Sequence, residues 1–190
     1  MTALTAEQAW AILGKHCTEP HLLTHARSVG AAMGAMAEHF QADRDHWIAV
    51  GYLHDIDYQD YPEEHCRHVA EFLQPEGVDE ADIHAIVTHG WGTCSDEEPQ
   101  SDLEKSLFTV DELTGIVFAC ALMRPTGITD LEVKSALKKF KDKRFAAKCD
   151  RDLILRGCEM LHMELNEVLA LTIAGMRGEA AALGLTGQSA

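Results

Sequence analysis

Apolar residues recur every three or four positions along most of the chain, which predicts a succession of amphipathic helices. Alternation with a period of two is scarce, and we find no convincing strand. We therefore expect an all-α fold. The clearest stripe consists of Leu22, Ala26, Val29, Met33, Met36 and Phe40.

Start and stop signals divide this pattern into separate helices. Thr5 and Gln8 fit a capping box, Pro20 and Pro62 suit a first helical turn, and Asp79 suits an N-cap. Residues 129–132 are another capping-box candidate. The predicted helices cover about residues 5–15, 20–40, 44–54, a helix from Pro62 onward, 79–90, 102–123, and one or two helices over 150–183.

The chain has 190 residues, which suits one domain with a sizeable core. We expect a single helical domain over 1–190, with a core region at about 20–123 and C-terminal helices at about 129–183. The C-terminal region also holds the only dense basic run, Lys138 to Lys148, whose sign is opposite to that of the chain as a whole.

The formal net charge is −15, which disfavours binding to nucleic-acid polymers or to an anionic membrane surface. A small phosphorylated substrate is still compatible with this charge, because a local cationic site can overcome the average field. No apolar run is long enough for a membrane span. Six scattered cysteines without a CxxC pair predict free thiols in a reducing compartment, the cytoplasm.

Several predicted helices place one histidine or aspartate on an otherwise apolar inner face. A single inward histidine is typical of a hydrogen-bonded core residue, but five such helices are harder to explain in that way. A buried carboxylate is costly unless it is paired or binds a metal. Imidazole and carboxylate are ligands of zinc, iron and manganese. The residues are His25, His54, His65, His89 and Asp111, and Asp55 adjoins His54 where its helix ends.

The order of these residues resembles the H…HD…D signature of the HD-domain superfamily of metal-dependent phosphohydrolases. The stretch 'YLHDID' resembles the family's 'LLHDIG', the segment from His65 to Leu73 resembles 'HxxxGAxxL', and 'AIVTHG' resembles its next histidine-bearing element. The resemblance covers about Pro20 to Met123. Asp57-Tyr58 is a departure, because the family often has Gly-Lys there.

The resemblance implies a helical bundle around one or two divalent ions (Mn, Fe, Co, Ni, Mg or Zn). It implies a first-metal set of His25, His54, Asp55 and Asp111, with Asp55 able to bridge and with Asp55 and His54 as catalytic residues. In members with two metals the extra histidines bind the second ion. Since His65 and His89 are both present, we favour a binuclear site.

The resulting hypothesis is a phosphohydrolase that acts on a small phosphorylated metabolite or nucleotide. A di-iron oxygenase of the same superfamily and a non-catalytic nucleotide- or metal-binding sensor are the alternatives. Asp57, Glu64 and His68 are candidates to orient the ligating imidazoles. The candidates for substrate phosphate binding are Arg27, Lys139, Lys143 and Arg144, although the basic run also suits a solvated helix face.

Overall fold

The computed structural model describes residues 3–187, and all regular secondary structure in that range is helical. The all-α prediction is therefore confirmed. The α-helices and two short 3₁₀ helices, η1 and η2, are α1 (Ala6–His16), α2 (Pro20–His39), α3 (Arg44–Leu53), η1 (Pro62–Glu64), α4 (Val69–Leu73), η2 (Gln74–Glu76), α5 (Glu80–Thr88), α6 (Asp102–Leu122), α7 (Val133–Lys141), α8 (Arg151–Leu161) and α9 (Leu165–Gly178).

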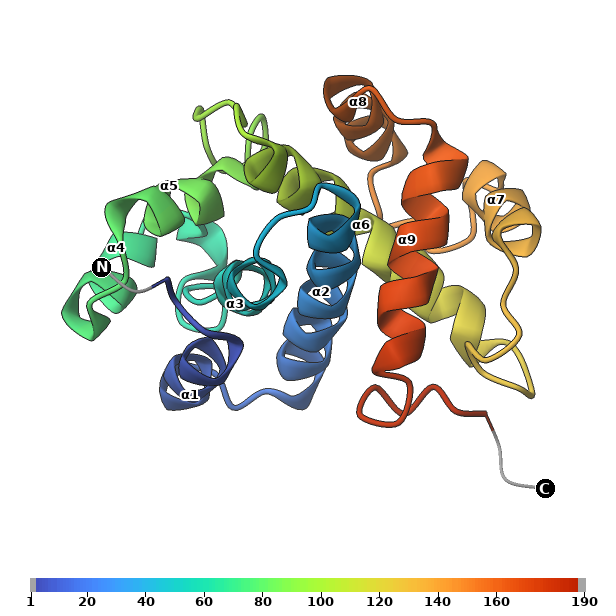
Figure 1. The fold of residues 1–190 in the computed structure, drawn as a ribbon, viewed down its shortest axis with the longest axis horizontal. Coiled ribbons are helices and arrows are strands. Elements are labelled where there is room, and N and C mark those ends of the chain that lie inside the picture. The colour runs from blue at the N-terminus through green and yellow to red at the C-terminus, as the bar shows by residue number, and fades with distance from the viewer. Residues whose placement is uncertain (1–2, 188–190) are drawn as a thin grey trace.

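The two longest helices, α2 and α6, pack against each other in the middle of the molecule (Figure 1). Helices α1, α3, α4 and α5 lie on one side of this pair, and α7, α8 and α9 lie on the other. Helix α9 packs along α2, and α8 packs along α6. The C-terminal helices therefore cover the same two central helices as the N-terminal ones.

Local capping sets most of the helix boundaries. Thr5 accepts from the backbone N–H of Gln8, and Ser101 forms the same kind of capping box with Glu104 at the start of α6. His162 takes a left-handed backbone conformation after α8. That residue divides the last third of the chain into two helices, one of the two outcomes that its pattern allowed.

One predicted helix is much shorter than expected, and one predicted helix start is wrong. Pro62 begins only the three-residue 3₁₀ helix η1, because His65 has a non-helical ψ of 145° and Cys66 has a positive φ of 70°, which no continuing helix can accommodate. Thr129 does not cap a helix either. Its hydroxyl donates to the carbonyl of Thr126, and α7 begins only after Glu132.

Helices α2 and α3 cross at two glycines. A Cβ atom added to Gly51 would lie 2.8 Å from the Cα atom of Gly30, closer than real Cβ contacts come. The neighbouring atoms are backbone and cannot move independently of their helix. This close crossing draws together the helices that carry His25 and His54.

We expect Gly51→Ala to lower the free energy of unfolding by about 1–3 kcal/mol, through overpacking between α2 and α3. The matched control is Gly14→Ala in α1, where an added Cβ meets nothing within 4 Å. This control should be neutral or stabilising by up to about 1 kcal/mol, since alanine favours an exposed helix. Urea unfolding of both variants measures the difference, and equal effects would contradict the close crossing.

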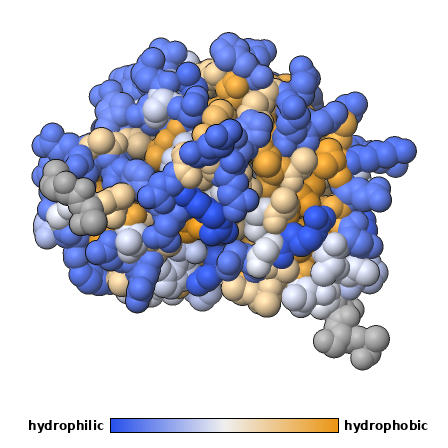
Figure 2. Space-filling view, in the orientation of Figure 1, coloured by the Kyte–Doolittle hydropathy of each residue, from blue (hydrophilic) through white to orange (hydrophobic). Residues whose placement is uncertain are grey.

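Hydrophilic side chains cover much of the face viewed in Figure 2, with apolar residues visible between them. Among residues 3–187, the helices are too short or too polar to cross a membrane.

Candidate metal centre

The structure brings together all six residues that the sequence proposed as metal ligands. Helix α2 supplies His25, the end of α3 supplies His54 and Asp55, and α6 supplies Asp111. The remaining two come from the segment after η1 and the end of α5. They are His65 and His89.

One group of ligand atoms surrounds the Nε2 atom of His25. It lies 2.9 Å from Asp111 Oδ1, 3.2 Å from His54 Nε2 and 3.6 Å from Asp55 Oδ2. His54 Nε2 in turn lies 3.3 Å from Asp55 Oδ2 and 3.4 Å from Asp111 Oδ1. We call these four residues the first ligand set.

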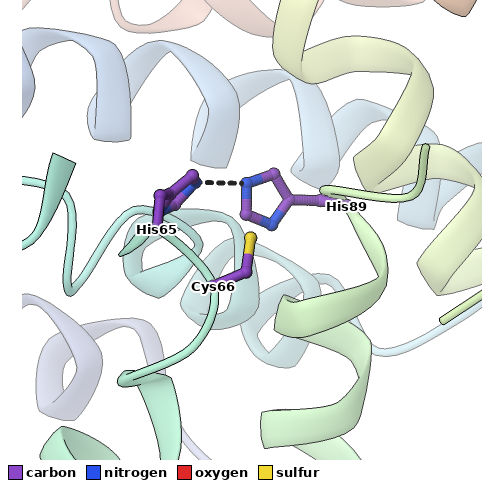
Figure 3. A group of neighbouring side chains, drawn as sticks. All are labelled: His65, Cys66 and His89. Carbon is purple, nitrogen blue, oxygen red and sulfur yellow. Dashed lines mark hydrogen bonds between the residues drawn. The ribbon is translucent and has the colours of Figure 1, made fainter. Parts of the chain in front are cut away.

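A second group uses the other oxygen of Asp55. Its Oδ1 atom lies 3.1 Å from His65 Nε2 and 3.6 Å from His89 Nε2. The two imidazole nitrogens are 3.1 Å apart and face each other (Figure 3). We call these three residues the second ligand set, and Asp55 is common to both sets.

Hydrogen bonds behind the rings fix the tautomers. A carbonyl oxygen can only accept, so the Nδ1 of His54 donates to Gly51 O at 2.9 Å. The Nδ1 of His89 likewise donates to the carbonyl of Ile86. In a neutral imidazole the Nε2 atom then carries a lone pair, and in both residues that atom points into the cluster.

Asp57 fixes the third imidazole in the same way. Its Oδ1 atom accepts a hydrogen bond from the Nδ1 of His65 at 2.7 Å, and its Oδ2 atom accepts one from the backbone N–H of His68 at 3.2 Å. The carboxylate is fully buried. Carboxylate–imidazole pairs of this kind orient metal-binding histidines and raise their basicity.

The donor set and its spacing fit divalent metal ions. Two ligand atoms held about 2.1 Å from one ion, at octahedral to tetrahedral angles, lie about 3.0–3.4 Å apart. The separations within each ligand set fall in or near this range. Moreover, the lone pairs of neutral His65 and His89 would repel each other at 3.1 Å unless a proton or a metal ion lay between them.

The carboxylates of the cluster give it a strong preference for positive charge. Burial alone would lower the pKa of the His54 imidazole, but Asp55 and Asp111 outweigh burial and hold this pKa well above its ordinary value. At His65, the carboxylates of Asp55 and Asp57 likewise overcome burial and raise the pKa to about 10. Protons on the imidazoles therefore compete with metal ions for the same lone pairs.

The other two residues proposed to orient the imidazoles make no contact with a ligand. Glu64 accepts a hydrogen bond from the Nε2 of His68 at 2.8 Å, and the His68 ring stacks on Tyr61. Of the three candidates, only Asp57 touches the cluster. Its place in the sequence is where the related motif often has glycine.

Cys66 lies beside the second ligand set. Its Sγ atom is within 4.8 Å of nitrogen atoms of His65 and His89. In Figure 3, however, the sulfur points to the side of the His89 ring and not into the gap between the two imidazoles. Its nearest polar neighbour is the Sγ of Cys94, at 2.8 Å.

The cluster opens into a cavity of about 490 Å³, within the usual size range of small-molecule sites. Lys148 lines it and is the one lysine or arginine among the lining residues. The candidate ligands His25, Asp55, His65, His89 and Asp111 line it too. The other lining residues include His21, Leu22, Tyr58, Cys94, Phe108, Glu112, Cys149 and Leu153.

None of the four residues predicted to bind substrate phosphate lines this cavity. Arg27 lies over the Trp10 ring and pairs with Glu179 at 3.3 Å, so its charge is already engaged. Lys139 lies over the Phe145 ring. Lys143 and Arg144 are exposed, which agrees with the solvated-face interpretation of the basic run.

The fold and the cluster define an all-helical domain with a site suited to divalent metal ions. Residues 22–115 match the family model described as HD domain, and this range contains all six candidate ligands. The chain therefore contains an HD domain over these residues, and HD domains are all-helical and bind divalent metal ions. No curated protein and no solved structure shows significant similarity to the chain.

Proposed function

We propose that this protein is a phosphohydrolase that binds two divalent ions and cleaves a small phosphorylated metabolite or nucleotide. The observation that carries the proposal is the pair of ligand sets that share Asp55. Two ions bound in this way neutralise phosphate oxygens and lower the pKa of a bound water toward neutrality. The protein's own part is to hold the ligands in place and to shape the cavity.

The second ligand set leaves room for water and substrate. It offers two imidazoles and one shared carboxylate oxygen, fewer donors than a closed structural site uses. The cavity adjoins it and gives a ligand access. This open set supports a catalytic role over a purely structural one.

The cavity is lined by several acidic residues, so a phosphate ester would need positive charge from metal ions and from the protein in order to bind there. Asp55, Asp111 and Glu112 all line it, and burial together with the charge of Asp111 raises the pKa of Glu112 to about 7. These acids would repel a phosphate ester in the absence of bound cations. Lys148 is the side chain placed to add positive charge from the protein.

The turn that presents Lys148 is held rigidly by Arg151. The guanidinium of Arg151 donates to the carbonyls of Ala146 and Cys149 at 2.9 Å and 2.8 Å, on either side of Lys148. Further bonds run to the carbonyls of Phe140, Asp142 and Phe145. A preorganised turn of this kind reduces the entropy lost when a side chain engages a ligand.

We expect Lys148→Ala to lower kcat/KM for a phosphorylated substrate by about 10–100-fold, the usual worth of a hydrogen bond to a charged group. Metal content should stay unchanged, because Lys148 is no ligand. The matched control is Lys143→Ala, an exposed lysine of the same segment that does not line the cavity. Steady-state kinetics compare the two, and a larger effect at Lys143 would contradict this assignment.

The proposal is tested by elemental analysis of the purified protein, followed by a panel of phosphate mono- and diesters assayed with the metal found. We expect close to two divalent ions per chain and turnover of at least one small ester. Oxygen-sensitive iron with a visible spectrum and no phosphatase turnover would favour the di-iron oxygenase instead. Nucleotide-induced thermal stabilisation without any turnover would favour the sensor.

A further inference from the structure

Two cysteines that are 28 residues apart in the sequence meet beside the second ligand set. The Sγ atoms of Cys66 and Cys94 lie 2.8 Å apart. A disulfide has an S–S distance of about 2.05 Å, so a small side-chain movement is enough to join them. All six cysteines are free thiols, and within residues 3–187 no other two of them have their sulfur atoms in contact.

The backbone conformation at Cys66 favours the contact between the two sulfur atoms. Cys66 has a φ of 70°, a left-handed conformation that residues other than glycine rarely adopt. This turn places His65 in the second ligand set and Cys66 beside that set, where its sulfur contacts Cys94. Strained backbone that the surrounding structure maintains is concentrated at functional sites.

Gly90 leaves the space that the two sulfurs occupy. A Cβ atom at this position would collide with Cys94 Sγ and would lie 2.6 Å from Cys66 Sγ. The turn that carries Cys94 is also fixed, because Cys94 N–H and Ser95 N–H both donate to the carbonyl of Gly90, at 2.9 Å and 3.0 Å. The contact between the thiols is therefore set by the backbone.

The two thiols differ in access. Cys94 is half-buried and lines the cavity, whereas Cys66 is buried, with 5% of its surface exposed. A small oxidant that enters the cavity reaches Cys94 first. Cys66 then lies at contact distance to resolve the oxidised sulfur, an arrangement typical of redox-sensitive cysteine pairs.

We propose that Cys66 and Cys94 form a reversible disulfide when a peroxide oxidises the protein. The sulfur of Cys94 attacks a peroxide oxygen, the O–O bond breaks, and a sulfenic acid and one water form from thiol and hydrogen peroxide. The sulfur of Cys66 then attacks that of Cys94, the S–O bond breaks, and a second water leaves. Two thiols and one peroxide thus give one disulfide and two waters, with both sulfurs oxidised and both peroxide oxygens reduced.

The bond would join the segment that follows His65 to the loop that follows His89. It closes a loop of chain and so restricts the unfolded state. The oxidised protein should therefore unfold at a higher Tm than the reduced one, and a thiol reductant should reverse the shift. In a reducing compartment the pair would stay as thiols until peroxide appears.

The test treats the full-length purified protein with a small excess of hydrogen peroxide and measures its intact mass. We expect the loss of two hydrogen atoms, a Cys66–Cys94 cross-linked peptide in a non-reducing digest, and recovery of the thiols with dithiothreitol. The control Cys149→Ser removes another cavity-lining thiol and should keep the cross-link. In Cys66→Ser, a dimedone-reactive sulfenic acid should accumulate at Cys94.

Three results would overturn the proposal: addition of oxygen at Cys94 without a cross-link in the wild-type protein, cross-links that involve Cys149 equally, or no oxidation of either thiol. None of these readouts depends on phosphatase activity. The disulfide and the proposed enzymatic function can therefore fail separately.

Discussion

Replacing Asp55 by Asn is expected to remove both metal ions and the phosphatase activity together. The two oxygens of Asp55 serve different ligand sets: Oδ2 faces His25 and His54, and Oδ1 faces His65 and His89. An amide of the same shape offers one oxygen in place of two and carries no charge. We expect kcat/KM to fall by about a thousandfold or more, since metal ions contribute several kcal/mol to such reactions.

The measurement combines metal content by elemental analysis with kinetics on the best ester of the panel. The control is Asp60→Asn, an exposed carboxylate a few residues further along the same turn, which should retain both metals and activity. Unfolding of both variants by urea shows whether the fold survives. An Asp55→Asn protein that, once loaded with metal, still hydrolysed esters at the native rate would refute the proposed function.

The helical period of the apolar residues predicts the position of part of the cluster. His25 and Asp111 lie within long helices whose inner faces the 3.6-residue period identifies. His54 extends the inner face of α3, and Asp55 follows where the helix ends, so its side chain is free to turn to the same side. In these cases local periodicity and tertiary position agree.

His65 shows that a residue can be recognised although its local structure is predicted wrongly. The pattern places it on a helix that begins at Pro62, but η1 ends at Glu64 and His65 has a non-helical ψ of 145°. Its imidazole reaches the cluster because Cys66 turns the chain and Asp57 holds the ring. The motif resemblance therefore identified His65 better than helical periodicity did.

The remaining features have no local signal in the sequence. Lys148 lies in a turn and not on a helix, so no period distinguishes it from the lysines that point into solvent. Its direction depends on Arg151, which binds carbonyl groups on both sides of it. The contact between Cys66 and Cys94 depends on the approach of two loops far apart in the sequence. Such long-range contacts follow from packing and not from spacing.

Replacing Asp57 by Ala is expected to weaken the binding of the second metal ion selectively. Asp57 bonds to the Nδ1 of His65 and touches no member of the first ligand set. Loss of a carboxylate behind a metal-binding imidazole typically weakens metal affinity by about 10–100-fold. Titration with Mn²⁺, followed calorimetrically, should show one site near its native affinity and a second site weakened by that factor.

Two further variants separate the causes. Asp57→Asn retains an oxygen that can accept from His65 but removes the charge, so its second-site affinity should lie between those of the wild type and Asp57→Ala. Glu64→Gln alters a carboxylate of the same segment that touches only His68, and it should bind both ions normally.

Because Asp57→Ala also leaves the backbone N–H of His68 without its buried acceptor, a loss of about 1–3 kcal/mol in the free energy of unfolding is expected as well. Equal weakening of both sites in Asp57→Ala would mean that this carboxylate supports the fold of the whole cluster, and would argue against two separable ligand sets.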